Sequence, residues 1–264
     1  MATPTNRVSV SLANDLKPDR SASRRRSRSG GPEHLRHTLS LPLGIIAIVG
    51  GLVLGAMALP HIFAAIAVLQ AQPTVERYIS GEQGLFAADI ESAAERLEFA
   101  LDLAPDADTA LLLADLRLWQ ARRATDAKTN IAFARKSVDA AKIAVRHAPA
   151  HPVAWSILAD ATDVLMPGDP AVAAPLARAL EVAPYDPRRR NVRVELAMRH
   201  WPALPPRAQQ AAGPLIVAMA RNNVEALARL AKQNLGGLAA VRGSLAGDAE
   251  LARRFDAAYV ALPN

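Results

Sequence analysis

The stretch LPLGIIAIVGGLVLGAMALPHIFAAIAVLQA, residues 41–71, divides this chain into two parts of different character. The segment from Leu39 to Ala71 contains no Asp, Glu, Lys or Arg, and it is longer than the roughly 20 residues that a helix needs to cross a bilayer. A surface helix of a soluble protein normally carries a polar face, which this segment lacks. The sequence therefore predicts a transmembrane anchor over residues 39–72.

A cleaved signal peptide is the main alternative for this segment. Ala65-Ile66-Ala67 has the small-x-small form that signal peptidase accepts. Secretory apolar regions, however, extend over about 7–15 residues, and this segment is about twice as long and begins far from Met1. We therefore expect an anchor that is not cleaved.

Two features inside the segment affect how it would lie in a membrane. Proline disrupts a helix interior, so Pro60 is expected to kink or end the span and to leave about residues 43–59 in the bilayer. Gly51 and Gly55 form a GxxxG pair, a pattern that lets two membrane helices approach closely. These two glycines are the candidate face for a homodimer.

The net charge of +6 belongs to the N-terminal tail. Of the 31 Lys and Arg, eight lie in residues 1–40 together with only three of the 25 Asp and Glu, so the rest of the chain is close to neutral. Basic residues near a span mark its cytoplasmic side. The tail is therefore predicted to be cytoplasmic and the C-terminal domain to lie across the membrane. In a bacterium this topology is a single-pass inner-membrane protein with a periplasmic domain.

Residues 1–38 contain almost no large apolar side chains and cannot build a core, so the tail is predicted to be disordered. The run SASRRRSRSGG favours contact with anionic lipid headgroups. No aromatic residue is interleaved with these arginines to stack on bases, and nucleic-acid binding is therefore not expected.

From about Thr74 onward the chain is typical of successive helices separated by Pro and Gly. It is rich in Ala and Leu, which favour helix, and has no alternating β-branched runs typical of strands, so we predict an all-α domain. Three segments align with one another: LDLAPDADTALLLADLR from Leu101, VRHAPAHPVAWSILADAT from Val145 and LEVAPYDPRRRNVRVELA from Leu180. Each is expected to end one helix, turn at Ala-Pro and begin another.

These units resemble tetratricopeptide repeats, which are helix pairs about 34 residues long. The positions that match the second helix of the pattern are Ala93, Leu97, Ala100 and Pro105, then Ser137, Ala141, Ala144 and Pro149, then Val172, Leu176, Ala179 and Pro184. The positions that match the first helix are Leu113, Ala114, Trp155, Leu158 and Ala159. The resemblance covers about residues 81–200 and implies a solenoid that exposes a surface for partner proteins.

The resemblance divides the C-terminal part into helical repeats over residues 73–204 and a helical cap of three more helices over residues 205–264. The first two Ala-Pro turns lie farther apart than the last two, so an insertion is expected around residues 124–131. A generic antiparallel helical bundle with proline-punctuated loops is the alternative, because alanine-rich helix pairs mimic this repeat easily.

The third unit, from Leu180 to Pro202, also resembles helical-repeat accessory proteins of bacterial envelope polysaccharide clusters. This resemblance rests on a Pro-Tyr-x-Pro turn followed by a helix that carries several arginines. The arginines could equally form a solvated face or neutralise the C-terminal end of the preceding helix. The candidate partner-binding residues are Trp155, Tyr185, Arg188, Arg189 and Arg193.

The sequence offers little sign of catalytic chemistry. The absence of Cys excludes disulfides, thiolate zinc sites and cysteine nucleophiles. There is no HExxH, no glycine-rich phosphate loop and no GxSxG, and the six histidines are scattered. Carboxylate pairs such as Asp160 and Asp163 are expected on solvated helix faces. We therefore predict no catalytic residues, no metal site and no cofactor, and the chain is not expected to be an enzyme.

The predicted function is that of a membrane-anchored scaffold for protein–protein interactions in bacterial envelope biogenesis. Polysaccharide assembly or export is the pathway that the second resemblance implies, and the expected partner is a protein of an envelope complex. Three alternatives stay open. The first is an accessory protein of a translocon, a chaperone or a cytochrome-maturation complex. The second is an enzyme with a dispersed site, and the third is a purely structural oligomer built through the GxxxG pair of the span.

Overall fold

The computed structural model describes residues 36–264 apart from 83, 185–188, 235 and 264, and it describes side chains from residue 46 onward. Every regular element in these ranges is a helix, which confirms the all-α prediction for this part of the chain. In the part of the chain that the structure describes, two units meet between Gly51 and Leu52. The predicted basic tail lies almost wholly outside the described residues.

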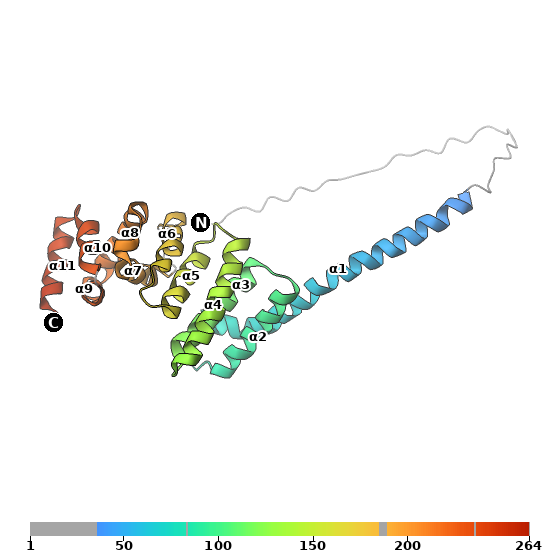
Figure 1. Cartoon of the computed structure of the whole chain (residues 1–264), viewed down its shortest axis with the longest axis horizontal. Helices are drawn as coiled ribbons and strands as arrows, with labels where there is room; N and C mark the ends of the chain where they lie inside the picture. The colour runs from blue at the N-terminus through green and yellow to red at the C-terminus, as the bar shows by residue number, and fades with distance from the viewer. Residues whose placement is uncertain (1–35, 83, 185–188, 235, 264) are drawn as a thin grey trace, which may run out of the picture. The chain divides into compact units, whose positions relative to one another are not determined.

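Helix α1 extends from Arg36 to Ile79 (Figure 1). It is long and apolar enough to cross a membrane, with a mean hydropathy of 2.3 in its most apolar stretch. The helix continues through Pro60, so the expectation that it could end there is wrong. A proline inside a helix removes one backbone hydrogen bond, and the bonds on both sides of Pro60 hold the helix together.

The last part of α1 packs on α2, which extends from Ala87 to Leu103. The side chains of Ala64 and Ala67 cluster with Ala100 of α2, and Ala71 and Val75 continue the buried stripe into the main core. These residues recur every three or four positions, which places them on one face of α1. Alanine at the contact lets the two backbones approach closely.

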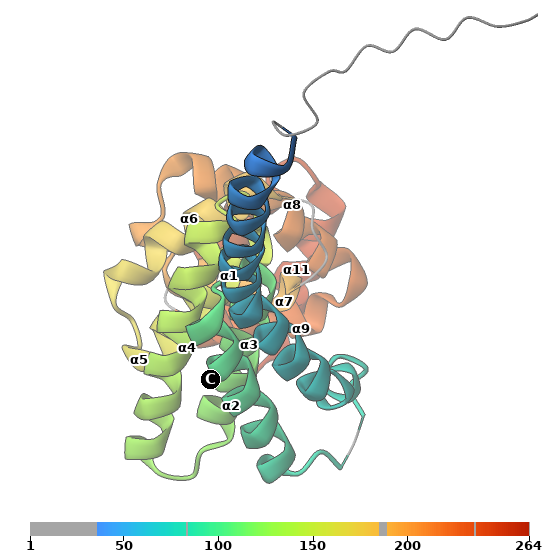
Figure 2. The ribbon, with the colours of Figure 1, turned by 90° about the vertical axis from the view of Figure 1, so that its right-hand side faces the viewer.

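Five further helices follow α2, and each contacts the next along the chain. Helices α3, α4 and α5 lie side by side (Figures 1 and 2). In addition, α3 contacts α5 and α5 contacts α7, so alternate helices share a side of the domain. The bounds are α3 Ala107–Arg123, α4 Ala127–His147, α5 Pro152–Leu165, α6 Ala173–Val182 and α7 Arg190–Arg199, with short 3-10 helices at Pro170–Val172 and Trp201–Ala203.

All three predicted Ala-Pro turns fall between helices. Helices α2, α4 and α6 each end two residues before the proline of the turn, at Leu103, His147 and Val182. Side-chain caps fix where α3 and α5 begin: the Asp106 carboxylate accepts from two backbone N–H groups of α3, and the His151 ring accepts from the Ala154 N–H of α5. Residues 124–131, where an insertion was expected, form the turn after α3 and the first turn of α4.

The residues that carry the repeat pattern form the core of the domain. Every small or apolar position of the three second helices is buried, as are Leu113, Ala114, Leu158 and Ala159 of the first helices. Ser137, the polar member of the pattern, donates its hydroxyl to the Ala114 carbonyl at 2.7 Å and joins α4 to α3. Buried small residues allow the close approach that the repeat pattern requires.

Four helices follow residue 205, whereas the sequence predicted three. The missed helix is α10, whose segment is rich in glycine and therefore looks like a loop. A Cβ atom added to Gly236, directly before α10, would lie 2.6 Å from the Met198 carbonyl oxygen, so glycine allows this close contact. The bounds are α8 Pro206–Asn222, α9 Val224–Gln233, α10 Gly237–Leu245 and α11 Ala249–Ala261.

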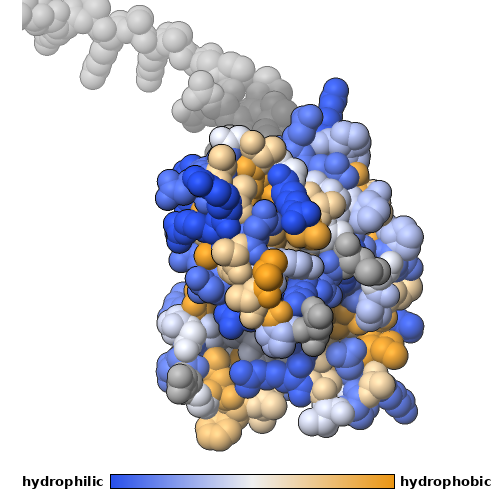
Figure 3. All heavy atoms as spheres, turned by 90° about the vertical axis from the view of Figure 1, so that its left-hand side faces the viewer, coloured by the Kyte–Doolittle hydropathy of each residue, from blue (hydrophilic) through white to orange (hydrophobic). Residues whose placement is uncertain are grey.

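The four last helices share a second apolar core with α6 and α7. Phe255 of α11 and Ile216 of α8 are among its fully buried side chains. The face at the C-terminal end of the domain interleaves hydrophilic and hydrophobic residues over its surface (Figure 3).

Candidate functional site

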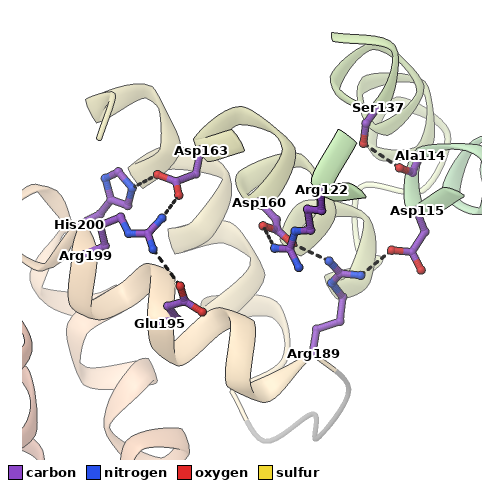
Figure 4. A network of polar contacts seen from close by, with 10 residues as sticks. All are labelled: Ala114, Asp115, Arg122, Ser137, Asp160, Asp163, Arg189, Glu195, Arg199 and His200. Atoms are coloured by element: carbon purple, nitrogen blue, oxygen red, sulfur yellow. Dashed lines mark hydrogen bonds and ion pairs between the residues drawn. The ribbon is translucent and has the colours of Figure 1, made fainter. Parts of the chain in front are cut away.

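A chain of ion pairs joins α3, α5 and the start of α7 (Figure 4). Asp115 Oδ1 lies 2.6 Å from Nη1 of Arg189, and Arg189 Nη2 lies 2.7 Å from Oδ2 of Asp160. The other oxygen of Asp160 accepts from Nη2 of Arg122 at 2.5 Å. These four residues alternate in charge, and we call them the Arg–Asp ladder.

The ladder is buried at its centre and reaches solvent at one end. The side chain of Asp160 is 3% exposed and that of Arg189 is 17% exposed, whereas that of Arg122 is 48% exposed. Burial alone would lower the pKa of the Arg189 guanidinium, but the carboxylates of Asp115 and Asp160 together raise it above its usual value. Each buried charge is thus held by opposite charges, which offset the cost of removing it from water.

Arg189 also adopts an unusual backbone conformation. Its φ of 56° and ψ of 20° are left-handed, and among the described residues it is the one non-glycine with a positive φ. A left-handed non-glycine residue costs on the order of 1–3 kcal/mol and persists only where its surroundings fix it. The two carboxylates that bind the guanidinium provide that constraint.

The buried position of the carboxylates corrects a prediction. Asp160 and Asp163 were expected on a solvated face, but they are 2% and 4% exposed. Their helix, α5, has no solvent-exposed face in this stretch, because nearly every residue from Ala154 to Asp163 is buried. This apolar surrounding was visible in the sequence and was the signal that the two acids required partners.

Asp163 belongs to a second cluster at the end of α7 (Figure 4). One of its oxygens lies 2.8 Å from Nε2 of His200, and the other accepts from Arg199. Arg199 also binds Glu195, one turn earlier on α7, at 2.8 Å. This cluster ties the end of α5 to the end of α7, just as the ladder ties α5 to the start of α7.

Arg193 connects α7 to two more helices. Its Nε donates to the Ser156 hydroxyl of α5 at 2.8 Å, and its Nη1 donates to the Ala183 carbonyl at 3.0 Å. Ala183 is the C-cap of α6, so a cation lies at the negative end of that helix. The interpretation that the arginine run neutralises the preceding helix is therefore correct for Arg193, and the alternative of a solvated face is wrong for it.

A further buried arginine lies between α2 and α3. The Arg117 side chain is fully buried, and it binds Glu91 at 2.6 Å and Glu98 at 2.9 Å. Gln120 also donates to Glu91, at 2.6 Å. Burial raises the pKa of Glu91, but the hydrogen bonds from Arg117 and Gln120 outweigh this effect and lower the pKa below its usual value. Sequence reasoning missed this cluster, because its members lie 19 to 29 residues apart.

An aromatic hollow opens beside the ladder, at the junction of α1 and α3. It has a volume of about 380 Å³, and its lining includes Tyr78, Leu85, Trp119 and Arg123. The rings of Tyr78 and Trp119 meet edge to face, and the Arg123 guanidinium lies 4.4 Å from the centroid of the Trp119 ring. Asp115 precedes Trp119 by four residues, so the hollow and the ladder share one side of α3.

The described structure places three of the five predicted partner-binding residues. Trp155 is half-buried, and its indole N–H donates to the Pro149 carbonyl at 2.8 Å, which closes the turn between α4 and α5. Arg189 and Arg193 are engaged in the contacts within the domain given above. Tyr185 and Arg188 lie outside the described residues.

The two glycines of the candidate dimer face lie in α1. A Cβ atom added to Gly51 or Gly55 would meet nothing within 4 Å, so both positions are open to a partner. Large apolar side chains around them are exposed, including Leu52 and Leu54 at 68% and 69%.

The clusters described here hold helices together, since their carboxylates are paired with arginine, histidine or glutamine within the domain. Among the residues described, no three His, Asp or Glu side chains come close enough to hold a metal ion. No protein-family model, no curated protein and no solved structure matches this chain. The site therefore has to be interpreted from its own chemistry.

Proposed function

We propose that this chain is a membrane-anchored helical-repeat scaffold that binds a partner protein on the side formed by α3, α5 and α7. The observation that carries the proposal is the alternation of contacts, in which α3 touches α5 and α5 touches α7 although α4 and α6 separate them in sequence. In arrays of helix pairs, the first helices of successive units line one continuous binding surface.

Two features favour this side as the binding surface. The Arg–Asp ladder and the Asp163 cluster fix the three helices with respect to one another, and a rigid surface loses little conformational entropy when it binds. The aromatic hollow beside the ladder combines Trp119 and Tyr78 with the exposed Arg123, and Trp, Tyr and Arg are the residues most enriched in binding hot spots.

Helix α1 supplies the anchor in this proposal. Positive charge in the N-terminal tail favours a cytoplasmic tail and a periplasmic domain in the inner membrane of a bacterium. Tethering would raise the effective concentration of the domain near membrane-bound partners. The Gly51/Gly55 pair allows the scaffold to be a homodimer, and the resemblance of the third unit favours a partner in envelope polysaccharide biogenesis.

Site-specific photocrosslinking tests the binding surface. A crosslinking amino acid at Arg123 is expected to give a discrete product with another protein in intact cells, and Trp119→Ala is expected to remove that product. The same amino acid at Arg254, another exposed arginine, on α11, is the matched control and should give no such product. Equal products from both positions, or a product that survives Trp119→Ala, would contradict the proposal.

A further inference from the structure

An exposed apolar patch lies where the C-terminal part of α2 packs on α1. Phe63 and Ile66 of α1 and Phe99 of α2 border a hollow of about 310 Å³, together with Glu95 and Arg96. The three apolar side chains are 52%, 44% and 53% exposed. A patch of this kind on a domain with a well-formed core requires an occupant.

The position of the patch along α1 indicates what covers it. This step rests on the proposal that α1 is a membrane anchor. About 20 residues cross the hydrocarbon core, so a span that begins near Leu43, directly after Pro42, leaves it near residue 62. The headgroup layer adds about 5–7 Å, or about four residues of helix. Phe63 and Ile66 therefore lie at the boundary between acyl chains and headgroups.

Helix α2 reaches the same depth as these two residues. Ala100, next to Phe99, clusters with Ala64 and Ala67 of α1, so the Phe99 ring lies beside the end of the span. One turn farther from the bilayer, Arg96 Nη1 donates to the Gln70 carbonyl at 3.1 Å. Within the hollow the apolar side chains therefore lie nearer the bilayer than Glu95 and Arg96, and Asp102, one turn beyond Phe99, is exposed at the level of the headgroups.

We infer that Phe99, together with Phe63 and Ile66, binds the lipid bilayer at the level of the headgroups. The domain then contacts the membrane through α2 as well as through α1. A second point of contact restricts how the domain can tilt around the end of the span.

The absence of cysteine from the chain allows a direct test. Three full-length variants, Phe99→Cys, Phe86→Cys and Leu54→Cys, are spin-labelled and reconstituted into vesicles of phosphatidylethanolamine and phosphatidylglycerol. Collisions of the label with oxygen, which concentrates in lipid, are compared with collisions with a water-soluble nickel complex. Phe86 is the matched control, because it is a 73% exposed phenylalanine at the far end of α2.

We expect the label at position 99 to collide more with oxygen than with nickel and the label at position 86 to show the reverse. The label at position 54 reports on the anchor itself and should lie deepest in lipid. An Ile66→Cys variant gives a second measurement at the patch and is expected to behave as position 99 does. Circular dichroism of each variant verifies that the helices are intact.

Two other outcomes are distinguishable. A label at position 54 in lipid with labels at positions 99 and 66 in water would overturn the inference and leave the anchor in place. A label at position 54 in water would overturn the anchor, and the inference with it.

Discussion

Helix α1 exposes apolar side chains, whereas helix α5 buries charged ones. In α1, Leu54 and Met57 are 69% and 67% exposed, and in α5, Asp160 and Asp163 are 2% and 4% exposed. Both patterns reverse the usual distribution of soluble proteins. The difference is that the acids of α5 have partners within the chain, while Leu54 and Met57 are exposed in a stretch of α1 that is apolar enough to cross a membrane.

The largest effect is expected from replacing exposed apolar side chains of α1. Replacing both Leu54 and Met57 by Arg is expected to raise the apparent free energy of membrane insertion by about 5–7 kcal/mol, because each arginine costs about 2.5–3.5 kcal/mol near the centre of a span. The double variant should be extracted from membranes by alkaline carbonate. The double alanine variant is the control and should stay in the membrane pellet. Full retention of the arginine variant would contradict the anchor.

The second largest effect is expected from removing a buried acid of α5. Asp160→Ala removes the carboxylate that binds Arg122 and Arg189, and it leaves the largely buried Arg189 with one carboxylate fewer. We expect the free energy of unfolding to fall by about 3–5 kcal/mol, measured by urea denaturation of the full chain in detergent. Asp102→Ala, on the exposed side of α2, should change it by less than about 0.5 kcal/mol. Similar losses in the two variants would contradict the ladder.

The third prediction concerns the close packing between the end of α7 and the start of α10. A Cβ atom at Gly236 would lie 2.6 Å from the Met198 carbonyl oxygen and 2.6 Å from the Trp201 Cβ, so Gly236→Ala is expected to destabilise the domain by about 1–3 kcal/mol. Gly243 lies inside α10 with open space around it, and Gly243→Ala should stabilise the domain by up to about 1 kcal/mol. Equal effects in thermal unfolding would show that α10 is not packed in this way.

The smallest effect concerns pH. The pKa of Glu91 is lowered in the folded chain, so its contribution to stability is present above its unfolded pKa and disappears as the pH falls through the folded value. Because its side chain is 37% exposed, Glu91→Gln should cost less than about 1 kcal/mol at neutral pH. The difference between variant and wild type in the free energy of unfolding should shrink in acid. A difference that grows as the pH falls would contradict this ion pair.

The comparison also explains how much the sequence could predict. Local signals were sufficient for the helix ends, since Pro105, Pro149 and Pro184 each follow a helix by two residues. They were also sufficient for the apolar helix, whose composition is local. The sequence did not predict helix α10. Its segment begins with Gly236 and Gly237, which approach Met198 and Ala231 closely, and local helix propensity does not reflect such tertiary contacts.

The candidate site was harder to predict than the fold. Asp160 meets Arg122 and Arg189 across separations of 38 and 29 residues, and Asp163 meets His200 across 37. Pairings at such distances depend on how the helices stack. The sequence contained the acids in an apolar helix and the excess of arginines in the next unit, but it did not indicate which acid each arginine would bind.

The most direct test of the central claim, an anchored domain across the membrane from a basic tail, is the accessibility of single cysteines in a bacterial host. Ser21→Cys reports on the tail, and Val260→Cys, at a position 81% exposed on α11, reports on the domain. The account predicts that a membrane-impermeant maleimide labels position 260 in intact spheroplasts and position 21 only after lysis. Labelling of position 21 but not of position 260 in intact spheroplasts, or of both to the same extent, would contradict it.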